Sequence, residues 1–516
     1  MMSTHNLTTW SFEAAQVHKA SSVAEVVALV TKARRRNVAL YPFSTGLNWG
    51  YGSRSPTAAG CELLDLRGMN RILNADVLGP AHPVAVIEPG VTQGQLHDFL
   101  AAHHPKLGFN VTGSGRDTSI IGNALERGSG YGGPRTEDIF GLEIVTGTGE
   151  VIHTGFRRLG DDSPLAHCHP YGLGPMLDGL CSQSSFGVVT SACLKLTTRR
   201  PVEAAVSVSM LEQVELGALI DAVSQLKREG LLTGVMHLAN KARTVLTLQL
   251  GVETYLRDIR RVEPAQLAAE TQKAIDCVAS RAWSGLGTVH GNRAQVQGAM
   301  VEIRQRLKGL ARVTMVDQFK LDTAFAICDS LANMAPMRAR AAALAAIRPL
   351  HAMALGHPSD VAVDGLLARY GPPGLKASEL DDSNCGLIYV NPALPMDGRF
   401  IAATVAAMQG VAAAHGHELY VTVNLETSTS NVGVMNILFD RSQPAEVDRA
   451  RRCADALLRC VHERGLEVYR ARADMMGVVT GRNPEHWRWV SELKRVFDPD
   501  NIISPGRYCP LAPGQI

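Results

Sequence analysis

The chain has 516 residues, 46% of them hydrophobic, and its basic and acidic residues leave a formal net charge of +2. This length exceeds what one hydrophobic core usually organises, so we expect two domains. The balanced charge argues against a nucleic-acid partner, and no stretch approaches about 18 uninterrupted apolar residues, so no membrane span is expected.

The first third of the chain predicts short helices and strands in alternation. Ser21-Ser22 precede an apolar-rich helix over Val23–Val30. Arg34–Arg36 mark the end of this helix, where the helix dipole favours cations. Further expected elements are strands at 37–41, 61–66 and 84–88, a helix at 93–103 opened by Thr92, and a hairpin at 142–153 around Thr146–Gly149.

The glycine-rich character stops near Arg199-Arg200-Pro201. Beyond it we expect long helices alternating with strands, which include strands at 244–250 and 387–390 and one alanine-rich helix at 324–350. A final helix is expected at 487–496.

The ten cysteines show no CxxC pair and no metal-ligand spacing, which suggests a reducing, cytoplasmic compartment. His167-Cys168-His169 could suggest a metal site, but it leads directly into a glycine-rich stretch, and we favour a structural role and expect no metal. The N-terminus has no basic region followed by an apolar run, so no signal peptide is evident.

The chain is organised around the loop Pro42–Pro56, PFSTGLNWGYGSRSP. Its small residues leave backbone N–H groups free to converge on a concave site, which suits a diphosphate, and Ser44 and Thr45 add hydroxyl donors. Taken alone, the loop would be interpreted as a glycine-rich surface turn.

Three further stretches accompany this loop, at Val111–Tyr131, Tyr171–Thr190 and Phe497–Tyr508. Their motifs are S-x-x-G-N-x-x-E-R-G, Y-G-x-G-P…D-G-L-x-S-Q-S, and D-P…I-I-x-P-G-R. Together with P-x-S-x-G-x-N-x-G-Y-G in the first loop, they resemble the flavoprotein family of vanillyl-alcohol oxidase and the p-cresol methylhydroxylase flavin subunit. The four motifs occur in the family's order over nearly the whole chain.

This resemblance implies an α+β, two-domain fold that binds FAD. The expected parts are an FAD-binding domain over 1–200, a cap domain forming the substrate cavity over 201–468, and a C-terminal segment over 469–516 that returns to the first domain. The cofactor contacts that it implies are Pro42, Ser44, Thr45, Gly46, Leu47, Asn48, Gly113, Ser114, Ser119, Gly122, Asn123, Gly128, Tyr131, Gly187, Val189 and Arg507.

The resemblance also assigns catalytic roles. Arg507 would lie near the pyrimidine edge of the flavin and stabilise its anionic reduced form. Tyr51, Tyr469 and Arg470 would hold the oxygen of a para-substituted phenol. One opposite charge and two hydrogen bonds favour the phenolate, which releases a hydride from its benzylic carbon and becomes a quinone methide.

Two departures from the family pattern concern the cavity. No carboxylate stands at Gly113 or Ser114, where the family has an acid or base beside flavin N5, and Asp117 is the nearest candidate replacement. Tyr131 is followed by Gly132–Arg135 instead of the family's T-P-Y-G, which predicts a rebuilt cavity wall.

The family's usual flavin-linking histidine is missing. Leu387 stands at its position and has no nucleophilic atom, so we expect dissociable FAD. Strand alternation places Leu387, Tyr389 and Cys385 on one face. A small shift in the alignment of this strand with the family's would bring Tyr389 to the flavin ring, so a covalent link through Tyr389 stays open.

Two alternative functions remain at this point. A 2-hydroxy acid oxidoreductase would use Arg470 to bind the substrate carboxylate, and a non-catalytic flavin-binding subunit would need no acid or base. Oxygen, a quinone and a cytochrome are all compatible electron acceptors, and assembly as a homodimer is open.

Overall fold

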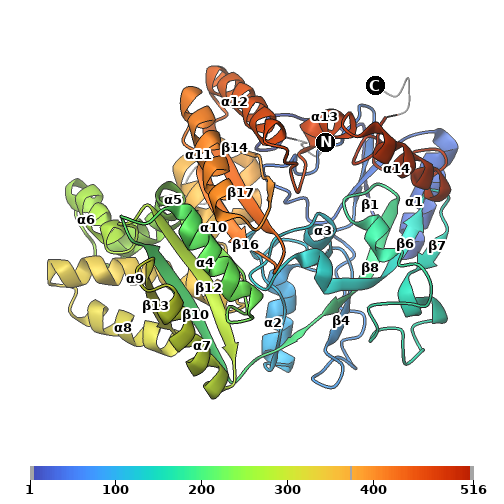
Figure 1. The fold of residues 1–516 in the computed structure, drawn as a ribbon. Coiled ribbons are helices and arrows are strands. Elements are labelled where there is room, and N and C mark those ends of the chain that lie inside the picture. Colours follow the sequence, from blue (N-terminus) through green and yellow to red (C-terminus); the bar gives the residue numbers. More distant parts are fainter. Residues whose placement is uncertain (1–4, 372–374, 512–516) are drawn as a thin grey trace.

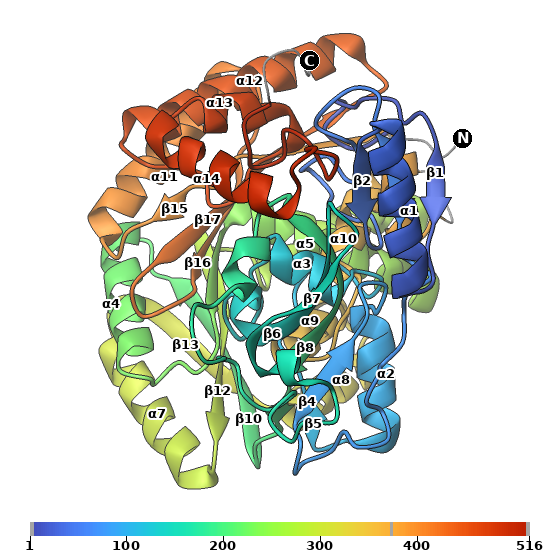
Figure 2. The same ribbon diagram turned by 90° about the vertical axis from the view of Figure 1, so that its right-hand side faces the viewer.

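The structure, a computed structural model, describes residues 5–371 and 375–511 as an α+β arrangement with strands in four sheets (Figure 1). The α+β prediction is therefore confirmed. One large sheet and its helices form one side of the molecule, and three smaller sheets form the other (Figure 1), which faces the viewer in Figure 2. No helix within these described ranges combines the length and the apolar character needed to cross a membrane.

The smaller sheets come from the first 200 residues. A parallel sheet has the order β1 (Val17–Lys19), β3 (Glu62–Asp65), β2 (Leu40–Phe43). An antiparallel sheet has the order β4 (Val84–Ile87), β8 (Gly187–Lys195), β6 (Ile139–Thr146), β7 (Val151–His153), and β5 (Leu107–Gly108) pairs with β9 (Thr197–Thr198). The helices of this region are α1 (Val23–Arg36), α2 (Gln93–His103) and α3 (Ile120–Leu125).

The large sheet is antiparallel and takes its strands from residues 202–440. Its order is β13 (Ala311–Val316), β10 (Val202–Met210), β12 (Trp283–Gly291), β11 (Met236–Asn240), β16 (Tyr420–Leu425), β17 (Asn431–Asp440), β14 (Cys385–Tyr389), and β15 (Ala393–Leu394) also pairs with β17. We retain the division at residues 200 and 468 as a proposal for the domain borders.

Helices cover both faces of the large sheet. The outer face packs against α4 (Leu216–Arg228), α7 (Arg293–Arg306), α11 (Gly398–Ala414) and α12 (Pro444–Glu463). The inner face is approached by α5 (Lys241–Thr254), α9 (Ala335–Ala354) and α10 (Val361–Tyr370), beside which lie α6 (Pro264–Asp276) and α8 (Gln318–Ser330). The chain ends with α13 (Met476–Thr480) and α14 (Pro484–Phe497).

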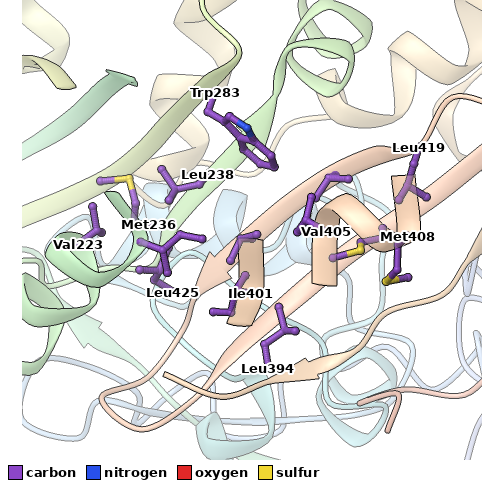
Figure 3. Close-up of a cluster of buried hydrophobic side chains, with 14 of the residues drawn as sticks. Val223, Met236, Leu238, Trp283, Leu394, Ile401, Val405, Met408, Leu419 and Leu425 are labelled. Atoms are coloured by element: carbon purple, nitrogen blue, oxygen red, sulfur yellow. The ribbon is translucent and has the colours of Figure 1, made fainter. Parts of the chain in front are cut away.

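Strand alternation divides the large sheet between a core and a cavity. Met236 and Leu238 of β11 are buried against the outer helices, where Figure 3 shows them near Ile401 and Val405 of α11. The residues that alternate with them, His237 and Ala239, face the other way and line a cavity. Because side chains alternate along a strand, one sheet builds both the hydrophobic core and the cavity floor.

Several predicted elements are confirmed. The helix at 93–103 is α2, and its N-cap Thr92 accepts a hydrogen bond from the Gln95 backbone N–H at 3.1 Å. The helix expected at Val23 begins there with Ser22 as its cap, and it ends at Arg36, within the cationic run expected at its end. Strand β2 therefore starts only at Leu40, because Asn37 ends the helix in the left-handed conformation that asparagine tolerates.

Two predictions in the middle region are wrong. The expected strand at 244–250 lies inside α5, where Leu246 packs with α10 and Leu248 packs with α9. This helix is apolar on two sides, which imitates the alternation of a strand. The expected single helix at 324–350 is two helices, α8 and α9, because Pro336 fits a first helical turn but cannot continue a preceding helix.

Candidate functional site

Two adjoining hollows lie where the loop after β2 meets the large sheet. The larger one, of about 860 Å³, lies between the inner face of the sheet, helices α5, α9 and α10, and the loop. The smaller one, of about 180 Å³, lies between the loop, α3, the start of β8 and the C-terminal segment. Leu47, Asn48, Asn123 and Arg470 line both, so the two hollows share one wall.

The structure brings the predicted cofactor residues together around these hollows. The smaller hollow is lined by Pro42, Ser44, Thr45, Gly46, Leu47, Asn48, Ser119, Gly122, Asn123, Gly187, Val189 and Arg507. The larger one is lined by Gly113, Ser114, Gly128 and Tyr131, which lie toward the large sheet. Residues from four separate stretches of sequence therefore form one continuous wall.

Close backbone contacts explain the glycines of this wall. The hydroxyl of Thr45 accepts a hydrogen bond from the Ser119 backbone N–H at 3.1 Å, which ties the first loop to the start of α3. A Cβ atom at Gly122 would lie 2.4 Å from Ser44 Oγ, so a larger residue would force the Ser44 hydroxyl out of its position. Gly46 has a φ of +75°, a conformation that L side chains rarely adopt.

Unpaired polar atoms fit a large polar cofactor in these hollows. Ser114 Oγ, Asn123 Oδ1, Ser185 Oγ and Trp49 Nε1 are buried and have no hydrogen-bond partner among the described residues. Buried polar groups are normally paired, so these atoms need a ligand or water. A diphosphate, a polyhydroxyl chain and a flavin ring together offer the donors and acceptors that such a set requires.

A buried ion cluster lies where the two hollows meet. Glu126 accepts a hydrogen bond from Arg507 Nη2 at 2.6 Å, and its second oxygen lies 3.6 Å from Arg470 Nε. Burial alone would raise the pKa of Glu126, but the charges of Arg507 and Arg470 more than offset this and hold the pKa below its usual value. One carboxylate thus faces two guanidinium groups, which leaves a net positive charge beside the cavity.

The predicted phenol-binding residues also meet at this junction. The guanidinium of Arg470 lies 4.3 Å from the centre of the Tyr51 ring, and its Nη2 donates to Asn48 Oδ1 at 2.5 Å. Tyr469 lines the same cavity. Burial raises the pKa of the Tyr51 and Tyr469 hydroxyls above their ordinary value, although Arg470 opposes this, so both stay protonated donors at neutral pH.

Asn391 orients one of these donors. Its Oδ1 accepts a hydrogen bond from the Met435 backbone N–H at 2.7 Å, so its Nδ2 must donate, and it donates to the Tyr51 hydroxyl at 2.5 Å. The Tyr51 hydroxyl therefore accepts from Asn391 and directs its own proton toward the Tyr469 hydroxyl, with which it shares a hydrogen bond. The sequence analysis did not identify Asn391 or Glu126 as site residues, although Glu126 is the glutamate of the motif S-x-x-G-N-x-x-E-R-G.

No aspartate or glutamate lines the larger cavity among the described residues. Asp117, suggested as a replacement for the family's carboxylate, is exposed and outside the cavity wall, so that suggestion is wrong. The cavity instead contains His237, whose pKa falls to about 4 because of burial. Its Nδ1 contacts Asn424 Oδ1 at 2.8 Å, and its Nε2 has no partner in the described part of the chain.

Strand β14 presents the residues considered for a covalent flavin link. Leu387 and Tyr389 both line the cavity, as their alternation predicts, whereas Cys385 is buried in the packing below and lies outside the cavity wall. The Tyr389 ring stacks on Tyr51 with 5.0 Å between ring centres. A Cβ atom at Gly50 would lie 2.5 Å from the Tyr389 ring, so the first loop packs directly on this side chain.

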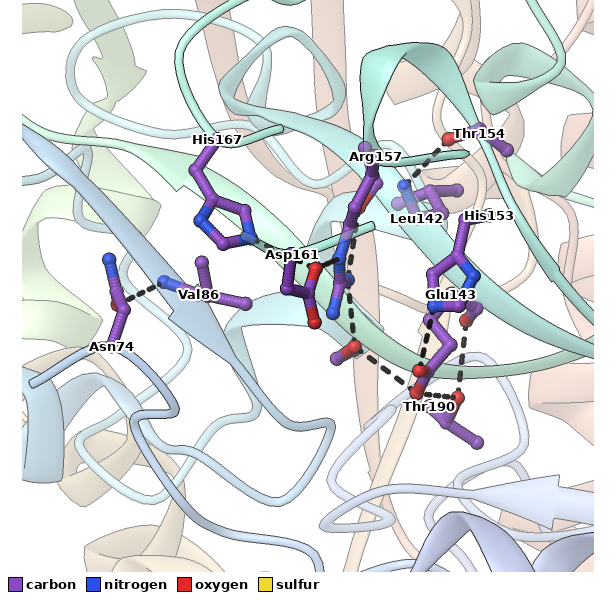
Figure 4. Close-up of polar contacts among 12 residues, drawn as sticks. Asn74, Val86, Leu142, Glu143, His153, Thr154, Arg157, Asp161, His167 and Thr190 are labelled. Carbon is purple, nitrogen blue, oxygen red and sulfur yellow. Dashed lines mark hydrogen bonds and ion pairs between the residues drawn. The ribbon is translucent and has the colours of Figure 1, made fainter. Parts of the chain in front are cut away.

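The His167-Cys168-His169 segment lies away from these hollows. His167 Nε2 is 3.1 Å from Asp161, which accepts a hydrogen bond from Arg157 Nε at 2.9 Å, and Figure 4 shows the three side chains facing one another. Arg157 is 1% exposed and also donates to Ser191 Oγ. Among the residues that the structure describes, no group of three or more His, Cys, Asp or Glu side chains could hold a metal ion.

Comparisons with known proteins agree with this geometry. Residues 14–155 match the model of an FAD binding domain. The chain is 30% identical over 499 residues to 1'-carboxy-chondrochloren decarboxylase of Chondromyces crocatus, covering 94% of this chain and 89% of that protein. It is 24% identical over 492 residues to the 4-cresol dehydrogenase [hydroxylating] flavoprotein subunit of Pseudomonas putida, covering 95% of this chain and 86% of that one.

A solved structure shares the fold. The 4-ethylphenol oxidase from Gulosibacter chungangensis, in complex with isoeugenol, superposes with a TM-score of 0.81 at 22% identity, covering 99% of this chain and 92% of that one. The likeness in fold, the matched FAD binding domain and the 30% identical relative all extend the resemblance first drawn from the four motifs. The chain thus belongs to the vanillyl-alcohol oxidase and p-cresol methylhydroxylase family of FAD-linked oxidoreductases.

Proposed function

We propose that this enzyme oxidises para-substituted phenols at the benzylic carbon. The observation that carries this proposal is the meeting of Tyr51, Tyr469 and Arg470 at the junction of the two hollows, with two protonated hydroxyls and one guanidinium in a largely buried place. Two similar proteins are named for phenolic substrates, 4-cresol and 4-ethylphenol, and this supports the same class here.

Different residues of the wall are proposed to bind different parts of the cofactor. We propose that the first loop and Ser119–Asn123 bind the FAD diphosphate, and that Arg507 lies at the pyrimidine edge of the ring. FAD, when bound, supplies the two-electron oxidation by accepting a hydride. Since Leu387 replaces a histidine and has no nucleophilic atom, we propose that FAD is held without a covalent bond.

The protein's own contribution to the chemistry is to stabilise a phenolate. Hydrogen bonds from Tyr51 and Tyr469 and the charge of Arg470 lower the pKa of the bound phenol. The phenolate oxygen then becomes a carbonyl as the benzylic C–H bond breaks and the hydride leaves, which gives a quinone methide. Addition of water to its benzylic carbon restores the phenol as a 4-hydroxybenzyl alcohol.

A second candidate is decarboxylation of a phenol-like acid. It is favoured by the relative that is 30% identical over nearly the whole chain and is named as a decarboxylase. The absence of aspartate and glutamate from the cavity wall, within the described residues, also suits a negatively charged substrate. Release of carbon dioxide from a carboxylated phenol would distinguish this reaction from simple dehydrogenation.

Anaerobic mixing of the FAD-loaded enzyme with candidate donors tests the proposal. We expect 4-ethylphenol or 4-hydroxybenzyl alcohol to bleach the flavin absorbance, and 2-hydroxy acids to leave it unchanged. Bleaching by a 2-hydroxy acid alone would contradict the phenol assignment. No bleaching by any donor would instead favour a non-catalytic flavin-binding role.

A further inference from the structure

The larger cavity has an unbalanced charge. Its wall carries five cationic side chains and, among the described residues, no carboxylate. These cations are Arg243, Arg281, Arg312, Lys320 and Arg470. A cavity of this composition selects against cationic ligands and favours anionic ones.

Four of the five cations are already compensated or in contact with water. Arg281 forms an ion pair with Glu212, and Lys320 Nζ lies 3.1 Å from Asp317 Oδ2. Arg470 Nε lies 3.6 Å from Glu126 Oε2. Arg312 is exposed to solvent. Arg243 therefore differs from the rest and is the cation of the cavity whose partner is missing.

Arg243 is half-buried and has no ion pair with any described residue. Its guanidinium makes one hydrogen bond to a side chain, from Nη1 to the neutral Asn436 Oδ1 at 3.3 Å. A guanidinium carries five N–H donors in a planar fork, so most of its donors remain available, and that fork matches a carboxylate. A partly buried charge without a counter-ion is costly, and an anionic ligand would remove this cost.

The position of Arg243 in its helix adds a second reason. It stands in the first turn of α5, whose N-cap Asn240 accepts from the Arg243 backbone N–H at 3.0 Å. The helix dipole disfavours a cation at this end and favours an anion. An anion held by Arg243 would therefore also have the sign that the start of α5 favours.

The path from the phenol-binding residues to Arg243 is short. Tyr389 stacks on Tyr51, and Asn436 lies directly across from Tyr389 between strands β14 and β17. Asn436 in turn contacts Arg243. The three steps, each roughly 5 Å, add to at most about 15 Å along this path. Tyr51 and Arg243 line the same cavity, so a phenol ring bound at Tyr51 can extend its para side chain toward Arg243.

We propose that Arg243 binds a carboxylate on the para side chain of the substrate. The substrate class is then a phenol whose para substituent ends in a carboxylate, and this assignment rests on the phenol binding proposed above. His237 does not compete for the carboxylate, because its Nδ1 faces the Asn424 oxygen and its Nε2 is left as an acceptor.

The test compares three ligands on the FAD-loaded enzyme. They are 3-(4-hydroxyphenyl)propionate, its neutral analogue 4-propylphenol, and 3-phenylpropionate, which has the carboxylate but no phenol. Concentration dependence of flavin bleaching gives the dissociation constant of each phenol, and perturbation of the flavin absorbance gives that of 3-phenylpropionate.

We expect Arg243→Gln to raise the dissociation constants of both carboxylates about 10- to 100-fold, as loss of a charge-assisted hydrogen bond implies. The dissociation constant of 4-propylphenol should change less than about threefold. Arg243→Lys should restore part of the carboxylate binding. Lys320→Gln removes a cation of the same cavity, but this cation already has a carboxylate partner in Asp317. This variant should therefore leave the dissociation constants of all three ligands unchanged. An unaltered flavin spectrum and melting temperature in each variant would show that the fold is retained.

Two results would overturn the proposal. One is an equal loss for 4-propylphenol and the carboxylates in Arg243→Gln, which would indicate general damage to the cavity. The other is carboxylate binding that does not depend on Arg243. If neither phenol bleached the flavin but 3-phenylpropionate still required Arg243, the phenol function would fail and the carboxylate site would stand.

Discussion

Replacing Glu126 with glutamine should destabilise the protein far more than replacing an exposed glutamate. The carboxylate lies 2.6 Å from Arg507 Nη2 and 3.6 Å from Arg470 Nε, and the side chains of these arginines are 6% and 9% exposed. Glu126→Gln keeps the shape but leaves two buried guanidinium groups facing each other without a counter-ion.

The magnitude follows from the burial of this cluster. Removing one partner of a buried ion pair typically costs about 3–5 kcal/mol. The Glu126 side chain is 21% exposed, so water screens part of the loss, and we expect about 2–4 kcal/mol. Glu492→Gln breaks a pair with Arg495 that is largely exposed and should change stability by less than about 0.5 kcal/mol.

The pH dependence of this contribution has a definite sign. The pKa of Glu126 is held below its usual value in the folded protein by Arg507 and Arg470. Its stabilisation is therefore fully present above about pH 4.3, the ordinary glutamate pKa, and is lost as the pH falls toward the lower folded pKa. The difference between the wild type and Glu126→Gln should shrink over that acidic range.

Urea unfolding of the apoprotein, followed by circular dichroism, measures these differences. Arg507→Gln should relieve part of the defect when added to Glu126→Gln, because it removes one of the two cations left unpaired. A stability loss in Glu126→Gln no larger than that in Glu492→Gln would refute the argument, as would a double variant that loses the sum of both single effects.

Three further predictions concern the cofactor and the substrate. Arg470→Ala and Tyr469→Phe should each weaken phenol binding by about 1.5–3 kcal/mol in titrations followed by flavin absorbance, and unchanged affinity in both would exclude their proposed role. Acid precipitation should leave the flavin in the supernatant, whereas yellow colour in the pellet would show a covalent link. Gly122→Ala should weaken FAD loading, because its Cβ would lie 2.4 Å from Ser44 Oγ and displace that hydroxyl, whereas Gly298→Ala on α7 has free space and should load normally.

The sequence by itself determined the features that depend on local backbone geometry. The first loop needs small residues and a positive φ at Gly46, and such requirements are visible in a single stretch of residues. Thr92 predicted the start of α2 for the same reason, since a helix cap satisfies N–H groups only a few residues away. The four motifs in order were also enough to indicate the family and its FAD.

Tertiary packing decided the secondary structure of segments whose local pattern of apolar residues does not match their burial. The run at 244–250 alternates like a strand, but Leu246 and Leu248 pack against different helices, and only the assembled fold shows that both sides are covered. A sequence gives the period of its apolar residues, and that period identifies an element only when one face is buried.

The composition of the cavity could be known only from the structure. Glu126, Asn391 and Arg243 lie far apart in the sequence, and each acquires its significance from a partner brought beside it by folding: Arg507, Tyr51 and Asn436. Local propensity carries no information about such long-range pairs. The sequence therefore determined the loops that suit the cofactor, whereas the large sheet decided which charged and polar side chains face the substrate, because alternation along its strands turns one set of residues into the core and the other toward the cavity.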